Sequence, residues 1–199
     1  LISAHADDSA DIVFFDVVSV YSETLEPAYR DRSVKLLFQR YHREHDNPDV
    51  FRCLYTNPWG KMIRRQLIID NDIRFEDIPS GNDCYFSVVA GLTARQVAVD
   101  ERPLYCITVR SGSITSTLDR EHLESNGQSR LRVNRLLRQR GYGRYQLSVL
   151  YYIGMARCFG WRYFLHAFYE SCRHGNRPWV GVSRLLKPDT LGGIPYKQK

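Results

Sequence analysis

The chain has 199 residues, of which 43% are apolar and 25% are charged, a balance typical of a folded globular protein and not of a disordered one. No run of 18 apolar residues occurs, which argues against a membrane-spanning helix. The formal net charge of +6 is uneven: residues 1–118 hold 13 basic and 17 acidic side chains, whereas residues 119–199 hold 15 and 5. The C-terminal part therefore favours an anionic partner, such as a nucleotide sugar, a nucleic acid or a lipid headgroup.

The sequence pattern of residues 1–118 predicts a mixed α/β fold. A nearly continuous run of Val, Ile and Phe at 11–20 predicts a buried strand. The spacing of Val34, Leu37, Phe38 and Tyr41 predicts a helix over 33–45. Further elements are expected in this order: a short helix at 51–55, a strand at 59–64, a helical turn at 65–71, a helix from 82 to about 92, and strands at 96–100 and 104–110.

Two details of these elements are specific enough to test. Asn82 or Asp83 is expected to cap the helix at 82–92, because either side chain can accept a hydrogen bond from an unpaired backbone N–H. The sequence Glu101-Arg102-Pro103 is expected to separate the last two strands as a turn.

The remainder, 119–199, is predicted to be a basic and mainly helical extension. One helix at 130–140 is expected to end at Gly141 and Gly143, and a second at 144–173 to end at His174-Gly175. We therefore expect two parts, a mixed α/β part over 1–118 and a helical extension over 119–199.

The cysteines indicate the compartment. Cys53, Cys84, Cys106, Cys158 and Cys172 form no C-x-x-C pair, which favours free thiols in a reducing environment. The first residues carry neither the basic start nor the apolar core of a signal peptide. We expect a cytoplasmic protein, with the inner membrane surface as a second place where it could lie.

Asp83 is the first candidate for chemistry. A carboxylate at a helix start often serves only as a cap. Gly81 before it leaves room for a ligand to approach, and a lone carboxylate at such a junction can also act as a general base toward a hydroxyl. The residue pattern alone leaves both interpretations open.

Two further pairs of residues could bind a substrate. Trp59 and Lys61 would lie on one face of a short strand, where Trp can stack on a sugar ring and Lys can bind hydroxyls or phosphates. Arg110 and Ser113 belong to R-S-G-S after a strand, a segment that can present a cation and backbone N–H groups to a phosphate. The alternatives are a core Trp with a surface Lys, and a solvated turn.

Five segments of the chain resemble the family 2 glycosyltransferases of bacterial polysaccharide synthesis, which have the GT-A fold. Their order and spacing match over about residues 10–116, although each segment alone is weak. The segments are D-I-V at 11–13, W-G-K-M-I-R-R at 59–65, I-R-F at 73–75, N-D-C-Y-F at 82–86, and P-L-Y at 103–105 followed by R-S-G-S-I-T at 110–115.

The resemblance implies a partial GT-A-like mixed sheet with flanking helices, and an inverting transfer of a sugar from a nucleotide-sugar donor to a saccharide acceptor. Asp83 would be the base that deprotonates the acceptor hydroxyl, with Asn82 beside it in the substrate site. Trp59 and Lys61 would border the acceptor pocket. By the same resemblance, Arg110 and Ser113 would face the donor diphosphate, and in a complete enzyme a divalent metal, Mn²⁺ or Mg²⁺, would stabilise the leaving diphosphate.

The chain also departs from the family pattern. Asn82 stands where the family has Glu, and the aromatic residue and Arg expected at Ile107 and Thr108 are absent. The nucleotide-binding half with its metal-binding Asp-x-Asp is expected before Asp11, and this sequence does not contain it. The triplet at 70–72 has the letters D-N-D but follows Trp59, so we expect a solvated turn there. We therefore expect no metal site within these residues and no transfer by this chain alone.

Two alternatives to the enzyme remain. One is a non-catalytic binding or scaffold fragment of the same fold, which the missing Asp-x-Asp favours. The other is a basic nucleic-acid-binding module, but base-stacking aromatics on a strand or a recognition helix do not occur, and we expect no nucleic-acid partner.

Two weaker patterns remain. The aromatic and basic residues of 144–173 suit an anionic membrane surface, or a core helix whose Arg side chains reach the solvent. Self-association into a homo-oligomer is left open. His42 and His45 are three residues apart with no third ligand evident, so we expect surface residues and not a metal site.

Overall fold

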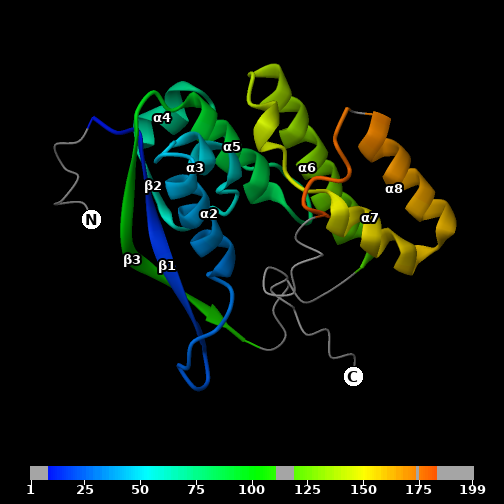
Figure 1. Ribbon diagram of the computed structural model, residues 1–199, viewed down its shortest axis with the longest axis horizontal. Coiled ribbons are helices and arrows are strands. Elements are labelled where there is room, and N and C mark those ends of the chain that lie inside the picture. The colour runs from blue at the N-terminus through cyan, green and yellow to red at the C-terminus, as the bar shows by residue number, and fades with distance from the viewer. Residues whose placement is uncertain (1–8, 111–118, 174, 183–199) are drawn as a thin grey trace.

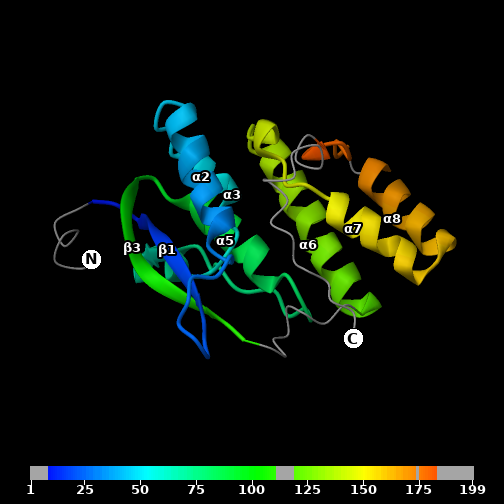
Figure 2. The ribbon, with the colours of Figure 1, turned by 60° about the horizontal axis from the view of Figure 1, so that its bottom comes forward.

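The computed structural model of the chain describes residues 9–110, 119–173 and 175–182. These residues form a mixed α/β fold, with a three-stranded sheet at one end and a group of helices at the other (Figure 1). The views in Figures 1 and 2 agree that the helices lie on one side of the sheet. The fold class is the one the sequence predicted.

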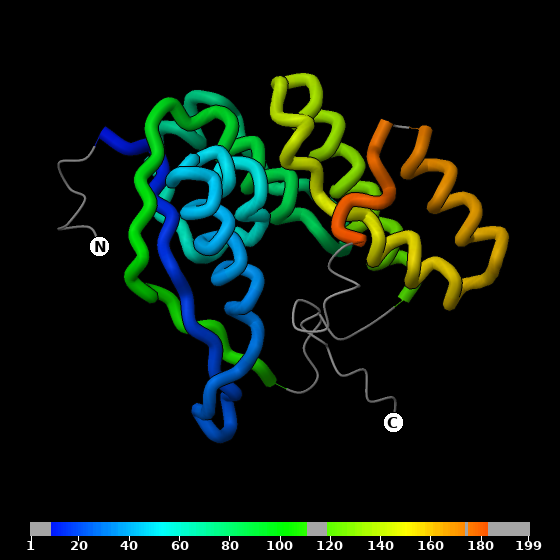
Figure 3. The backbone as a smooth tube through the Cα atoms, in the orientation of Figure 1, coloured from blue at the N-terminus to red at the C-terminus, as the bar shows by residue number. Residues whose placement is uncertain are grey.

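The sheet has the strand order β2-β1-β3. Its central strand β1, Ile12–Tyr21, pairs antiparallel with the short strand β2, Lys61–Ile63, and parallel with β3, Val97–Val109. The first six residues of β1 are all buried, which explains why the run at 11–20 is mostly apolar and does not alternate. The tube in Figure 3 shows β1 and β3 running side by side along most of their length.

Strand β3 corrects one prediction. The sequence predicted two strands separated by a turn at Glu101-Arg102-Pro103, but the structure has one strand of 13 residues. Its register shifts there: Phe15 pairs with Asp100, whereas the next residue of β1 pairs with Pro103. A bulge accommodates the proline, which has no N–H to give to a ladder.

Three helices pack on the sheet. These are α2, Arg32–Arg43, α3, Asp49–Leu54, and α5, Asn82–Thr93, while the short α4, Arg65–Asp70, follows β2. Val34 and Phe38 of α2 are buried as predicted, and Leu37 and Tyr41 pack against the core at its border. The largest core cluster joins them to β1, and in it the rings of Phe14 and Phe51 stack with centroids 5.5 Å apart.

The start of α5 corrects a second prediction. Neither Asn82 nor Asp83 caps this helix: both lie inside its first turn, and the N-cap is Gly81 with φ +81° and no side-chain hydrogen bond. A glycine adopts this left-handed conformation without the steric cost that a side chain adds. Asp83 is therefore a residue of the first turn of α5 and not its N-cap.

The C-terminal helices differ from the prediction in both length and number. Helix α6, Arg120–Gln139, begins ten residues before the predicted start, after Asp119, whose carboxylate accepts a hydrogen bond from the backbone N–H of His122 at 2.8 Å. The predicted helix at 144–173 is instead a 3-10 turn η2, Gly143–Tyr145, then α7, Leu150–Ala156, a second 3-10 turn η3, Arg157–Phe159, and α8, Trp161–Arg173. Gly160, with φ +102°, separates η3 from α8.

The mixed α/β part and the helical part share a core. Val50 and Cys53 of α3 and Val88 of α5 form one buried cluster with Val133 and Leu137 of α6. A second link is the buried hydroxyl of Ser129 of α6, which donates a hydrogen bond to Gly81 O at 2.9 Å. The boundary at residue 118 stays a prediction.

The last three helices have a core of their own. Leu123 and Leu131 of α6 pack with Tyr152 of α7 and with Tyr163 and Ala167 of α8. Figure 2 shows these helices next to one another, with α8 on the side away from the sheet. Within the part of the chain that the structure describes, no helix is both long enough and apolar enough to cross a membrane.

Candidate functional site

The first turn of α5 holds Asp83, the predicted catalytic residue. Its side chain is half-buried, and its carboxylate accepts hydrogen bonds from its own backbone N–H and from that of Cys84. Burial raises the pKa of Asp83 above its usual range, and it does so in spite of those bonds and of the positive charges of Lys61 and Arg130. A carboxylate with a raised pKa is a stronger proton acceptor than an ordinary one.

Lys61 supplies a positive charge that acts on this carboxylate from the sheet side. It begins β2 opposite Phe14 of β1, and its ammonium group is buried. Nζ donates a hydrogen bond to the carbonyl oxygen of Tyr55 at 2.6 Å and lies over the rings of Tyr55 and Phe14, 4.9 and 5.4 Å from their centroids. Burial lowers the pKa of Lys61 to about 7, although the charge of Asp83 acts in the opposite direction.

An aromatic wall stands beside Lys61. Trp59 stacks on Tyr105 of β3 with centroids 6.1 Å apart and the rings 4° from parallel. Trp59 also meets Tyr55 edge-on at 6.3 Å. Trp59 and Lys61 thus contact the same ring, and the 44% exposure of Tyr105 leaves part of the wall open to solvent.

Gly60 fixes this arrangement. It has φ +75°, and a Cβ atom at this position would lie 1.7 Å from the hydroxyl oxygen of Tyr55. Its carbonyl oxygen accepts a hydrogen bond from Phe15 N at 3.0 Å, which ties the turn to β1. Only a glycine allows Tyr55 to lie between Trp59 and Lys61 in this way.

Arg130 of α6 lines a cleft, and its positive charge acts on Asp83. The cleft has a volume of about 340 Å³ and lies between α2, the end of α3 and the segment that follows η2. Its wall includes Asn57, Arg130 and Ser148 together with Arg40 and Arg144. Both Arg40 and Arg144 form ion pairs with Glu44, whereas Arg130 binds Asn126 Oδ1 at 3.1 Å and Ser148 O at 3.4 Å. Among the three arginines of the cleft, Arg130 therefore has uncharged described partners. Its positive charge also lowers the pKa of Asp83.

The other predicted site residues lie apart from this group or outside the described residues. Asn82 is exposed beside Asp83. Arg110 is exposed and follows β3, whose last residue Val109 pairs with Tyr21, seven residues along β1 from the partner of Lys61. At about 3.3 Å per residue, this is roughly 23 Å of strand. The structure thus brings Asp83, Lys61 and Trp59 into one region but not Arg110, and Ser113 lies outside the described residues.

The described residues do not fit a metal ion. Within 9–110, 119–173 and 175–182, no three His, Cys, Asp or Glu side chains lie close enough together to hold one. The D-N-D triplet at 70–72 is an exposed turn, as predicted, in which Asp72 pairs with Arg74 at 2.6 Å. His42 is exposed and pairs with Asp46 and Glu101.

Three residues of the site were not singled out from the sequence. Tyr105 lies within the P-L-Y segment that carries the family resemblance, so its position offered a signal. Tyr55 precedes N-P-W and could have been found as an aromatic neighbour of Trp59. Arg130 is one of seven arginines between residues 120 and 144, and nothing in its local sequence distinguishes it.

No protein-family model and no curated protein matches the chain. Among solved structures, the chain is similar to the crystal structure of S. aureus TarS, residues 1–349, in complex with UDP-GlcNAc, with a TM-score of 0.45 and 18% sequence identity. The similarity covers 94% of this chain and 46% of the TarS chain, so the chain spans about half the length of that structure. A similarity at this level establishes neither a family nor an activity.

Proposed function

We propose that the chain is the acceptor-side part of a family 2-like glycosyltransferase, in which Asp83 removes the proton from an acceptor hydroxyl. The observation that carries the proposal is the state of Asp83: a half-buried carboxylate with a raised pKa, on which the positive charge of the buried Lys61 ammonium group acts. The order of the five sequence segments supplies the reaction class. The donor would be a nucleotide sugar, and the acceptor a saccharide of the bacterial cell surface.

The chemistry assigned to Asp83 is a single proton transfer. As the hydroxyl oxygen of the acceptor bonds to the anomeric carbon of the donor, the bond from that carbon to the diphosphate breaks, and the nucleoside diphosphate leaves with the electron pair. Asp83 takes the hydroxyl proton, and the anomeric centre is inverted. The raised pKa of Asp83 assists this step because it brings the affinity of the carboxylate for a proton closer to what the reaction requires.

The aromatic wall would bind the acceptor. The exposed part of Tyr105 and the ring of Trp59 offer flat apolar surfaces, on which the C–H faces of a sugar can stack. Lys61 would act on Asp83 and not on the substrate, because its ammonium group is buried and donates to Tyr55 O.

The test compares Asp83→Asn with Asp77→Asn, which removes an exposed carboxylate of the preceding loop. Both changes are made in the 199-residue chain and in the longer protein that the resemblance implies, and turnover is measured with a panel of nucleotide sugars. We expect transfer by the longer protein to be lost in Asp83→Asn and kept in Asp77→Asn, with unchanged folding in both. Equal turnover in the two variants would refute the assignment of the base.

For the 199-residue chain alone we expect no transfer and no tight nucleotide binding. Calorimetric titration with a nucleoside diphosphate and Mn²⁺ measures this directly. Micromolar binding would show that the donor site lies within these residues, contrary to the proposal.

A non-catalytic binding module is the second candidate, and the internal bonding of Lys61 favours it, since Tyr55 satisfies the cation without a ligand. Saccharide binding that depends on Trp59, together with turnover that does not depend on Asp83, would select this alternative.

A further inference from the structure

Helix α8 carries a stripe of exposed apolar side chains. Trp161, Leu165, Phe168 and Tyr169 are 67, 59, 45 and 59% exposed. At 3.6 residues per turn they fall within an arc of about 100° on the helix. Single exposed apolar residues are ordinary on a protein surface, but four on one side of one helix indicate a surface that contacts something else.

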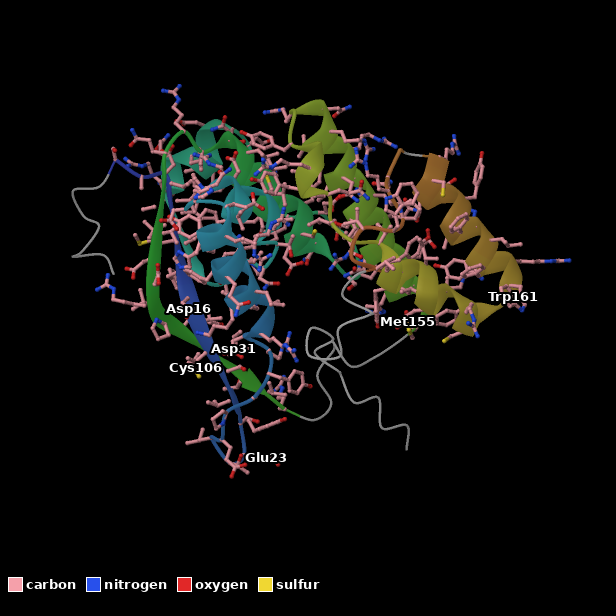
Figure 4. The ribbon with its side chains drawn as sticks, viewed as in Figure 1. Asp16, Glu23, Asp31, Cys106, Met155 and Trp161 are labelled. Carbon is pink, nitrogen blue, oxygen red and sulfur yellow. The ribbon has the colours of Figure 1, made fainter. Side chains whose placement is uncertain are left out.

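The opposite side of α8 holds this stripe in place. Tyr163 and Ala167 are buried against α6 and α7, and Ser171 on the same side is buried as well. The hydroxyl of Tyr163 donates to the carboxylate of Glu124, and the guanidinium of Arg120 lies over the Tyr163 ring, 4.6 Å from its centroid. The helix cannot turn its apolar side inward without breaking these contacts. Figure 4 shows Trp161 at the outer end of the molecule, farthest from the sheet.

Basic side chains border the stripe. Arg162 and Arg173 are exposed and follow Tyr169 around the helix within a further arc of about 40°. Arg157, in the turn before α8, is exposed and lies over the ring of Trp161 with 5.7 Å to the centroid. The one acidic residue of the helix, Glu170, pairs with Arg173 at 3.3 Å. The border is therefore basic on balance.

We propose that the stripe of α8 lies in the interface of an anionic lipid membrane. A helix with Trp, Phe and Leu on one side, bordered by arginines, is the pattern of helices that lie along a membrane surface, with the apolar side chains among the acyl chains and the cations at the headgroups. Charge decides between this occupant and a second copy of the chain. A symmetric contact would bring the same arginines against each other, whereas anionic headgroups complement them. The proposal does not depend on the transfer activity.

Flotation of the full chain with vesicles tests the proposal. We expect binding to vesicles that contain phosphatidylglycerol, weaker binding at high salt, and little binding to phosphatidylcholine alone. Trp161→Ser should weaken the binding by about tenfold or more, from the apolar area that no longer enters the membrane. Trp179→Ser is the matched control, since Trp179 is 65% exposed but lies outside α8, and it should bind like the wild type.

A second measurement reports the depth of insertion. Lipids brominated in the acyl chain should quench the tryptophan fluorescence of the wild type and of Trp179→Phe, but much less that of Trp161→Phe. No binding to anionic vesicles, or equal binding by the two serine variants, would overturn the proposal. Self-association in sedimentation that Trp161→Ser abolishes, in a protein that does not float with vesicles, would also overturn it and assign the stripe to a second copy.

Discussion

The ammonium group of Lys61 lies over the ring of Tyr55, with Nζ 4.9 Å from the centroid, and donates a hydrogen bond to the carbonyl oxygen of the same residue at 2.6 Å. Tyr55 thus supplies two contacts that compensate the buried cation, and the ring of Phe14 supplies a third, with its centroid 5.4 Å from Nζ. The compensation is partial, because burial lowers the pKa of Lys61 to about 7. The charge of Lys61 therefore changes near neutral pH.

The first prediction is a rise in stability with pH. The pKa of Lys61 in the folded state lies below that of an unfolded lysine, roughly 10.4, so the unfolded chain binds more protons in the window between them. The free energy of unfolding should rise with pH there, by up to about 1.4 kcal/mol per pH unit. Denaturant unfolding of the wild type and Lys61→Met measures the difference, and the rise should be missing in the variant.

Lys61→Arg is the control for this prediction, because arginine keeps its charge throughout the window. It should be less stable than Lys61→Met at every pH, and its stability should not rise. The stabilities are best compared in the lower part of this pH window. Burial raises the pKa of Cys53 to about 12 and of Cys84 to about 11, so these two thiols lower the free energy of unfolding as the pH rises further. A wild type whose stability does not change relative to Lys61→Met would contradict the prediction.

The second prediction concerns the stability of Asp83→Asn. The raised pKa of Asp83 means that the folded state binds its proton more tightly than the unfolded state does. Its contribution to stability is present at low pH and is lost as the pH rises through the folded pKa. At neutral pH the asparagine variant should be as stable as the wild type or more stable, and this difference should disappear in acid. A clear loss of stability at neutral pH would instead make Asp83 a structural carboxylate.

The third prediction sets two glycines against each other. A Cβ at Gly127 of α6 would lie 2.4 Å from the ring of Tyr152, whereas a Cβ at Gly154 of α7 would meet nothing within 4 Å. Gly127→Ala should lower the free energy of unfolding by about 1–3 kcal/mol because the ring must move. Gly154→Ala should raise it by about 0.5–1 kcal/mol, since alanine favours the helix. Thermal unfolding gives both signs, and equal effects would argue against the packing of α7 on α6.

The fourth prediction concerns Glu124, which joins the last three helices. It accepts hydrogen bonds from Tyr152 at 3.0 Å, from Gln128 at 2.8 Å and from Tyr163. Burial raises the pKa of Glu124, but these bonds outweigh it and leave the pKa below its usual value. The resulting stability is present above the unfolded pKa and is lost as the pH falls through the folded pKa.

Glu124→Gln should therefore cost about 1.5–3 kcal/mol of stability at neutral pH and less in acid. Glu121→Gln, which changes an exposed carboxylate at the start of the same helix, should have no measurable effect. Urea unfolding of the two variants at neutral and acidic pH separates them. If both variants unfold like the wild type, the hydrogen-bond network around Glu124 does not stabilise the helices.

Local periodicity was sufficient for the elements that bury one continuous face. The apolar run of β1 and the spacing of Val34 and Phe38 in α2 gave their type and nearly their bounds. The errors fall where long-range packing overrides a local signal. Helix α6 starts ten residues before its predicted start and includes Gly127, which provides the space that the ring of Tyr152 fills.

The site was predictable to the extent that its residues belong to short motifs. Asp83, Trp59 and Lys61 were singled out in this way and lie in one region, while their roles stay predictions. The effect of the Arg130 charge on Asp83 was not predictable, because it depends on how α6 packs on α5. The burial of the Lys61 ammonium group was not predictable either. It follows from the rings of Phe14 and Tyr55, whose positions over Nζ are set by the tertiary fold.

The position of β1 has a consequence for synthesis of the protein. Ile12 of β1 pairs with Val97 of β3, which is made 85 residues later. At ribosomal rates of 5–20 residues per second, the strand is without this partner for about 4 to 17 s. During that time the run at 12–17, every residue of which is buried in the finished fold, is exposed to other nascent chains. The yield of folded protein in the cell should therefore depend on the speed of translation and on chaperones that cover this strand.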